Sequence, residues 1–358
     1  MEKRSPLWYN EKKEVRMAKK ENSVKKNPLK IVLIIVACLL AAILLGIVGL
    51  VIYARAPLGD YYKNAEKAFL LPGIDSGFIP QGLAYDETRN VFFVSGYDGG
   101  KQPSSLYLVQ DGKAKHIPLL TENGEKFTGH SGGISHHGDY LYLAGSSKGC
   151  LYVLSYQDVL NAKDGESVRI RGSVKTFLGE NDPIRVSFTG STSTHIYVGE
   201  YYAKTGYSTP KTHHFESENQ SFGGLVLEYA FDESAEWGVA PTPTRALSVV
   251  NAVQGMCFNG NELFLSVSGG FAHSKILSYD MDKLPSLPDL TVFDASVPHY
   301  ATTDSALKKS IKTPPMSEEI VIINDKLYAA SEFAANRFVL GKFTGAKYCY
   351  ALDLTKYE

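Results

Sequence analysis

The chain has 358 residues, of which 44% are hydrophobic and 21% charged, a composition typical of globular proteins and sufficient for one large domain or two small ones. The net charge of −1 is unevenly distributed, because residues 1–30 hold ten Lys or Arg and four Glu, a net of +6, and the remainder carries −7. A mildly acidic main domain lacks the clustered cations that nucleic acid requires, so nucleic-acid binding is excluded from the expected functions.

An uncharged apolar run of 23 residues, IVLIIVACLLAAILLGIVGLVIY, occupies residues 31–53. As a helix it would extend about 35 Å at roughly 1.5 Å per residue, enough to cross a hydrocarbon core of about 30 Å. The cations before it predict a cytoplasmic N-terminus and an exported remainder. We therefore expect a basic cytoplasmic tail (1–30), a single transmembrane helix (31–53), a juxtamembrane linker (54–66) and an extracytoplasmic domain (67–358).

Two other interpretations of this segment would release or re-anchor the domain. Ala54-Arg55-Ala56 has the small-x-small form of a signal-peptidase site, but the apolar run is longer than the 7 to 15 residues of a typical signal peptide. Residues 35–38 loosely match a bacterial lipobox ending at Cys38, yet the sequence stays apolar well beyond this cysteine. An uncleaved signal-anchor is the preferred interpretation.

The expected exported domain contains three cysteines, Cys150, Cys257 and Cys349, which cannot all pair with one another. Each lies in an apolar, strand-like segment, so we expect buried free thiols. Their spacing includes no CxxC motif, which argues against a metal site built from cysteine.

Short β-rich segments recur from residue 60 onward, separated by turn residues, and predict an all-β domain. Each copy consists of a strand, a tight polar turn and a second strand, with Asn259-Gly260, His137-Gly138 and Asn324-Asp325 at equivalent turns. The copies begin 51 to 70 residues apart, more than the roughly 40 to 50 residues of common propeller repeats. They comprise residues 82–95, 133–145, 185–199 (a looser copy), 255–267 and 319–331.

A third strand follows each copy, and a fourth is expected after most of them, such as KHIPL, RALSVV and LTVFD. Four strands per unit indicate a propeller blade, so we expect a five-bladed antiparallel β-propeller, with a degenerate sixth blade left open. The last copy reaches the end of the chain after its third strand. We expect residues 67–73 to supply the missing strand, closing the ring and removing an open sheet edge.

The first copy opens with Ile79-Pro80-Gln81-Gly82-Leu83-Ala84-Tyr85-Asp86 and continues with strands at 91–95 and 106–109. This opening resembles that of the senescence marker/gluconolactonase, strictosidine synthase-like and NHL-repeat propellers. The resemblance covers the blade pattern over residues 71–354. It implies the propeller fold and says little about chemistry.

In such a propeller, the residues before each first strand and after each second strand meet at one end of the central channel. We expect a polar ring there, edged by aromatic side chains, that binds a protein, a glycan or a small ligand. The candidate binding residues are Gln81, Tyr97, Asp98, Arg185, Glu200, Tyr201, Gln254, His273, Glu332 and Asn336. For each residue the alternative is a structural role, since polar groups on propeller axes commonly join neighbouring blades by hydrogen bonds.

The candidate catalytic residues are His130, Glu318 and Asp182, with the titratable His130 as the best candidate for proton transfer. His136 is a poorer candidate, because its counterparts in the other copies, among them Phe188, are packing residues. His213-His214 lies in the long segment 204–222, which we expect to be an exposed loop.

The resemblance to gluconolactonase-like enzymes implies a divalent cation on the axis, held by acidic and amide side chains. Here the matching positions carry Gln81 and Gln254, with Glu318 and the nearby Asp182 as carboxylates, a small charge for Ca²⁺. No other cofactor is evident, and no GxSxG, HExxH or P-loop motif is present. We therefore expect a surface-anchored binding module; the alternative is a propeller hydrolase or lyase, with or without a divalent metal.

Overall fold

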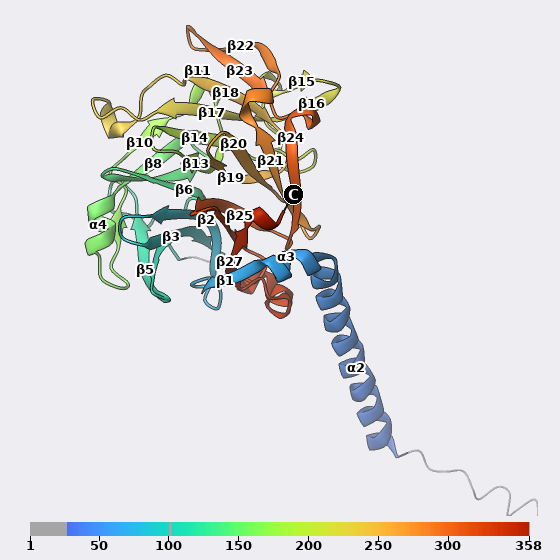
Figure 1. The fold of residues 1–358 in the computed structure, drawn as a ribbon. Coiled ribbons are helices and arrows are strands. Elements are labelled where there is room, and N and C mark those ends of the chain that lie inside the picture. Colours follow the sequence, from blue (N-terminus) through green and yellow to red (C-terminus); the bar gives the residue numbers. More distant parts are fainter. Residues whose placement is uncertain (1–26, 100–101, 358) are drawn as a thin grey trace, which may run out of the picture. The chain divides into compact units, whose positions relative to one another are not determined.

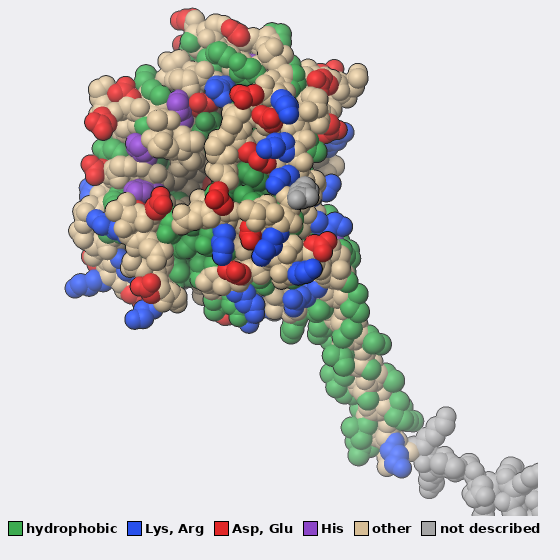
Figure 2. Space-filling model, viewed as in Figure 1, with side chains coloured by type: hydrophobic (Ala, Val, Ile, Leu, Met, Phe, Trp, Pro, Cys, Tyr) green, Lys and Arg blue, Asp and Glu red, His purple; other side chains and the backbone are tan. Residues whose placement is uncertain are grey.

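The computed structural model describes residues 27–99 and 102–357, so most of the predicted basic tail lies outside the described residues. The helix α2 (Pro28–Arg55) includes the whole predicted span and is long and apolar enough to cross a membrane. Hydrophobic side chains cover its surface (Figure 2). Two compact units are present, one ending at Gly49 and the other comprising Leu50–Glu358.

Within the second unit, five sheets are arranged around a central axis as a five-bladed β-propeller (Figure 1), which confirms the predicted fold. Each blade contains four antiparallel strands, and the innermost strand of each blade contacts those of its two neighbours. With strands given from the axis outward, the first blade is β2 (Phe78–Asp86), β3 (Val91–Asp98), β4 (Ser105–Gln110) and β5 (Lys113–Leu120), and the second is β6 (Ser131–His137), β7 (Tyr140–Gly145), β8 (Cys150–Ser155) and β10 (Gly172–Lys175). The third blade is β13 (Val186–Ser191), β14 (His195–Glu200), β17 (Gly224–Ala230) and β18 (Arg245–Val249), and the fourth is β19 (Val253–Asn259), β20 (Glu262–Val267), β21 (Ser274–Asp280) and β24 (Leu307–Thr313). The fifth and last blade is β25 (Ser317–Ile323), β26 (Lys326–Ser331), β27 (Tyr348–Asp353) and β1 (Ala65–Leu70).

The repeated sequence copies form the two inner strands of each blade. Their turns require left-handed backbone, and Gly260, Asn324 and Asp325 have φ of 57°, 48° and 62°, values that glycine and asparagine adopt readily. Apolar side chains on both faces of each sheet pack against the next blade, as Leu106 and Leu141 do between the first two blades. The predicted all-β pattern thus follows from sheets that are buried on both faces.

The third copy is offset by three residues from its predicted alignment. In the second blade, His136 of β6 pairs with Leu141 of β7. The residue of the third blade that occupies the same position is Ser191 of β13, which pairs with Ile196 of β14. Phe188, which we had aligned with His136, pairs with Gly199 instead and is completely buried. The looser sequence match concealed this shift, because this copy has no glycine to mark its start.

The N-terminal strand β1 closes the ring. Ala65 pairs with Leu352 and Leu70 with Tyr348, so β1 completes the last blade as its outermost strand, as predicted. The short helix α3 (Gly59–Asn64) precedes it, and within this part of the chain Leu58 and Tyr61 are buried in the core of the same unit. Residues 54–66, the expected linker, therefore make core contacts with the propeller.

One predicted fourth strand, LTVFD, was placed wrongly. It belongs to a hairpin of β22 (Ser286–Val292) and β23 (Ala295–Ala301), in which β23 extends the third blade by pairing in parallel with β18. The fourth strand of its own blade is β24, further along the chain. The remaining elements are α4 (Tyr156–Asn161), β9 (Val168–Arg169), β11 (Phe177–Gly179), β12 (Asp182–Pro183), β15 (Phe215–Ser217) and β16 (Gln220–Phe222).

The three cysteines of the propeller are buried and free, as predicted. Burial raises the pKa of the Cys150 thiol to about 11, which removes its reactivity as a thiolate at neutral pH.

Candidate functional site

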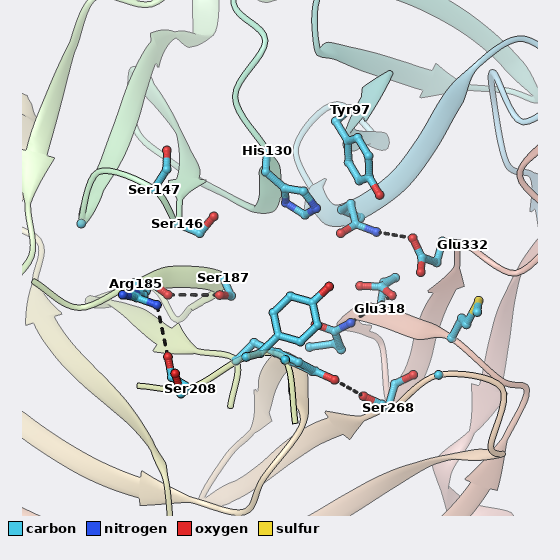
Figure 3. A pocket seen from close by; sticks show the side chains of 18 of the residues that line it. Tyr97, His130, Ser146, Ser147, Arg185, Ser187, Ser208, Ser268, Glu318 and Glu332 are labelled. Carbon is cyan, nitrogen blue, oxygen red and sulfur yellow. Dashed lines mark hydrogen bonds between the residues drawn. The ribbon is translucent and has the colours of Figure 1, made fainter. Parts of the chain in front are cut away.

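A pocket of about 810 Å³ lies at the end of the channel where the five inner strands begin. All five blades contribute to its lining, either from the start of the inner strand and the residues before it or from the end of the second strand and the loop after it (Figure 3). Eight of the residues expected from the sequence line it, namely Gln81, Tyr97, His130, Arg185, Tyr201, Gln254, Glu318 and Glu332.

Two carboxylates, Glu318 and Glu332, are placed on the same side of this pocket by β25 and the end of β26. Glu318 is only 2% exposed, and its Oε1 accepts a hydrogen bond from Gln254 Nε2 at 3.2 Å. Glu332 Oε2 accepts one from Gln81 Nε2 at 2.9 Å. Burial, reinforced by the charge of Glu332, raises the pKa of Glu318 well above its usual range, and burial raises the pKa of Glu332 to about 7.

His130 lies above these carboxylates, with its ring 4.3 Å from the ring of Tyr97. Arg337 Nη1 donates a hydrogen bond to the Tyr97 hydroxyl at 3.2 Å. Burial, and then the positive charge of Arg337, lower the pKa of His130, so this imidazole is neutral at pH 7. A neutral imidazole beside a carboxyl group of raised pKa can exchange protons with a ligand or help to bind a polar one.

Glu319, which the sequence analysis did not select, closes the channel below this pocket. Its Oε2 accepts hydrogen bonds from the backbone nitrogens of Leu83 at 2.7 Å and Ile134 at 2.9 Å, and its Oε1 accepts from the backbone nitrogen and hydroxyl of Thr189, both at 3.0 Å. These three residues occupy equivalent positions on the inner strands of three different blades. Burial raises the pKa of Glu319 to about 8, although the four donors favour its ionised form.

A signal for Glu319 is present in the aligned copies. Three of the copies begin with glycine at this position, Gly82, Gly133 and Gly255, whereas the last begins with Glu319. A Cβ atom on Gly133 would lie 2.7 Å from Glu319 Oε1. The absence of a side chain at Gly133 therefore leaves space that the carboxylate fills.

On the other side of Glu319 lies a second cavity of about 470 Å³. It is lined by the ends of the inner strands, including Asp86, His137 and Ser191, and by Glu319 itself. Because Glu319 borders this cavity and its side chain is held by three blades, it separates the two ends of the channel.

Asp182 and Glu200 bind a buried histidine and are not among the residues that line the pocket. His213 Nδ1 lies 2.8 Å from Glu200 Oε2, and His213 Nε2 lies 3.0 Å from Asp182 Oδ1. The exposed fraction of His213 is 0%, so the prediction of a solvated loop around it was wrong. Burial lowers the pKa of His213, but the hydrogen bond and charge of Glu200, followed by those of Asp182, outweigh it and the pKa is raised.

The long segment that contains His213 folds over the rim. It includes the β15–β16 hairpin, and its residues Tyr207 and Ser208 form one wall of the pocket. Ser208 O accepts a hydrogen bond from Arg185 Nη1 at 3.1 Å (Figure 3). Nothing in the local sequence marks these contacts, because they depend on the burial of His213 against two other segments of the blade.

Three further candidates do not line the pocket and contact other parts of the chain. Asp98 accepts a hydrogen bond from the backbone nitrogen of Gln102, 3.4 Å away. The ring of His273 lies 4.8 Å from that of Tyr53. Asn336 Nδ2 donates to backbone carbonyls of the segment before β2, including that of Ser76 at 2.7 Å.

The donor set of the pocket does not match a divalent cation such as Ca²⁺. Among residues 27–99 and 102–357, no group of three or more His, Cys, Asp or Glu side chains is placed to hold a metal ion. The amide nitrogens of Gln81 and Gln254 are directed at the carboxylates, so each glutamine acts as a donor here. Calcium requires six to eight oxygen ligands, several of them from carboxylates.

Comparisons with known proteins show no family for this chain. No protein-family model matches the chain, and no curated protein matches it. Similar solved structures include a PQQ-bound aldose sugar dehydrogenase from Streptomyces coelicolor (14% identity, TM-score 0.40, 80% of this chain and 96% of that chain), a glutaminyl cyclase from Myxococcus xanthus (10%, 0.39, 80% and 94%) and BamB from Moraxella catarrhalis (10%, 0.32, 76% and 84%). At these identities and scores they carry no argument about ligand or reaction.

Proposed function

We propose that this chain is a membrane-anchored, extracytoplasmic binding module that holds a ligand in the pocket at the start of its inner strands. The observation that carries the proposal is the pocket itself, to which all five blades contribute polar or aromatic side chains. Pockets that combine enclosure with a few convergent polar groups are typical ligand sites. A small molecule, a glycan end or a peptide end fits its volume of about 810 Å³.

The arrangement of the candidate catalytic residues supports binding over hydrolysis. His130 and Glu318 both line the pocket, whereas Asp182 is hydrogen-bonded to His213 and to the hydroxyl of Thr212 at 3.0 Å. A metal-assisted hydrolase would need these carboxylates to converge on one ion. The proposal therefore assigns His130 and Glu318 to ligand contacts.

Thermal unfolding of the full-length protein in detergent, measured across a ligand library, tests this function. A true ligand raises the melting temperature of the wild type, and Glu318→Gln and His130→Ala remain folded but lose the ligand-induced shift. Analysis of the recovered ligand by mass spectrometry separates the two functions, since a binding module returns it unchanged. A stabilising ligand whose effect survives both substitutions would place binding elsewhere and contradict the proposal.

The exported location is tested independently in intact cells. Protease added from outside should digest the propeller and spare the N-terminal tail, because the cations of that tail favour the cytoplasmic side. Protection of the propeller until the cells are broken would contradict this orientation.

A further inference from the structure

The charges that line the pocket are separated across it. Glu318 and Glu332 lie on one side, and Arg185 lies on the other (Figure 3). Two blades produce this separation, since the two carboxylates belong to the last blade and the guanidinium to the third. A ligand that spans the pocket therefore meets two carboxyl groups at one end and a guanidinium at the other.

Neither carboxylate forms an ion pair within 4 Å among the described residues, although the charge of Arg337 favours the ionised form of Glu332. The hydrogen bonds to the two carboxylates come from the uncharged amides of Gln254 and Gln81. A carboxylate accepts about four hydrogen bonds, so most of the acceptor capacity of both groups remains for a ligand.

A bound cation would favour the ionised form of this pair. An ionised carboxylate is destabilised when it loses water and when a like charge lies nearby, and both effects act on Glu318. An ammonium group placed between Glu318 and Glu332 would relieve the repulsion and supply three donors.

Aromatic rings complete the surroundings of this end of the pocket. The rings of Tyr201 and Tyr207 meet edge to face at 5.3 Å, and the Tyr201 hydroxyl donates to the carbonyl of Ser268 at 3.3 Å. Tyr97 also lines the pocket, next to Glu332 (Figure 3). Tyrosine faces attract cations through their quadrupole, and they also cover the hydrocarbon part of a ligand.

Arg185 is held in position at the other end. Its Nη1 bonds the carbonyl of Ser208, and its side chain is otherwise exposed to the pocket. A guanidinium has five N–H donors in a planar fork that matches the two oxygens of a carboxylate. The donors of Arg185 that Ser208 does not use can therefore form two parallel hydrogen bonds to one carboxylate.

Building on the proposed binding function, we propose that the ligand is a zwitterion of the amino-acid or short-peptide class, with its ammonium group between Glu318 and Glu332 and its carboxylate at Arg185. The pocket exceeds the size of a single small amino acid, so side-chain atoms or a second residue occupy the space between the tyrosines.

Melting temperatures of the full-length protein with four groups of probes test this assignment. The probes are free amino acids and dipeptides, the same compounds as C-terminal amides, their N-acetyl derivatives, and neutral disaccharides. We expect the zwitterions to give the largest shift, the amides a smaller one, and the last two groups none. Stabilisation by N-acetyl derivatives or disaccharides would overturn the zwitterion assignment while leaving the binding function intact. If none of the probes shifts the melting temperature, the zwitterion assignment is also overturned.

Matched substitutions locate the two ends. Glu332→Gln keeps a hydrogen-bonding side chain of the same size and should lower the affinity for zwitterions and for amides at least tenfold. Arg185→Ala should lower the affinity for zwitterions at least tenfold and leave the affinity for the amides unchanged. Equal losses for zwitterions and amides in Arg185→Ala would contradict the assigned orientation.

Discussion

Glu319 Oε1 lies 3.0 Å from both the backbone nitrogen and the hydroxyl oxygen of Thr189, a residue of a blade on the other side of the channel. With Leu83 and Ile134 on its second oxygen, this single side chain joins the inner strands of four blades, including its own. We infer that it stabilises the closed ring and divides the channel into two cavities.

Glu319→Gln should therefore destabilise the propeller markedly. The amide nitrogen would face two donors that have lost their acceptor, at about 1 to 3 kcal/mol for each buried group. We expect a loss of about 2 to 4 kcal/mol in the free energy of unfolding, measured by urea denaturation. Glu318→Gln is the matched control, equally buried but bonded to a single glutamine, and should change stability by less than about 1 kcal/mol. Similar losses in both variants would contradict the role of Glu319.

Gly133→Ala tests the space around the same carboxylate. The added Cβ would lie 2.5 Å from the backbone nitrogen of Thr189 and 2.7 Å from Glu319 Oε1, so the inner strands must separate. Overpacking of this kind costs about 1 to 3 kcal/mol. Gly179→Ala is the control, because no atom lies within 4 Å of its added Cβ. If both substitutions leave the melting temperature unchanged, the channel is not packed as described.

Removal of β1 should abolish cooperative unfolding of the domain. Deleting residues 65–70 leaves β27 as an open edge in the last blade, which destroys the only ladder between the two ends of the described propeller chain. Circular dichroism should show a broad transition at lower temperature. Deletion of residues 1–26 serves as the control and should leave the transition unaltered. A sharp, unshifted transition without β1 would contradict the closure.

The His213 cluster predicts a pH-dependent contribution to stability. The folded-state pKa of His213 is raised by Glu200 and Asp182, so its stabilising effect is fully present below its unfolded value of about 6.5 and is lost as pH rises through the folded value. The difference in melting temperature between wild type and His213→Asn should be larger at pH 5.5 than at pH 9. A difference that is constant across this range would mean that the ion pair does not contribute.

The sequence predicted the propeller because the copies repeat two β-rich segments around a polar turn, as at Gly260. It also placed Gln81, Gln254 and Glu318 together, since residues before an inner strand must converge on the axis. It could not identify His213 as buried, because that burial depends on Asp182 and Glu200 from other segments. Glu319 was missed although it replaces a glycine of the repeat, because its role requires knowing which strands it faces.

Affinity for an ammonium ligand should depend on pH through Glu332. Its pKa is raised to about 7, with Arg337 and Gln81 opposing the effect of burial, so it gains its negative charge between pH 6 and 8. The affinity of the wild type for amino-acid amides should increase over this range, provided that the amine is still protonated. Glu332→Gln should flatten the profile, and an affinity that decreases towards pH 8 in the wild type would contradict the pairing.

The most direct measurement is an experimental structure of the full-length protein with its best stabilising ligand bound. The account predicts ligand density between Glu318 and Arg185, in contact with side chains from several blades. Density confined to the cavity beyond Glu319, or to the outer surface of the blades, would contradict it.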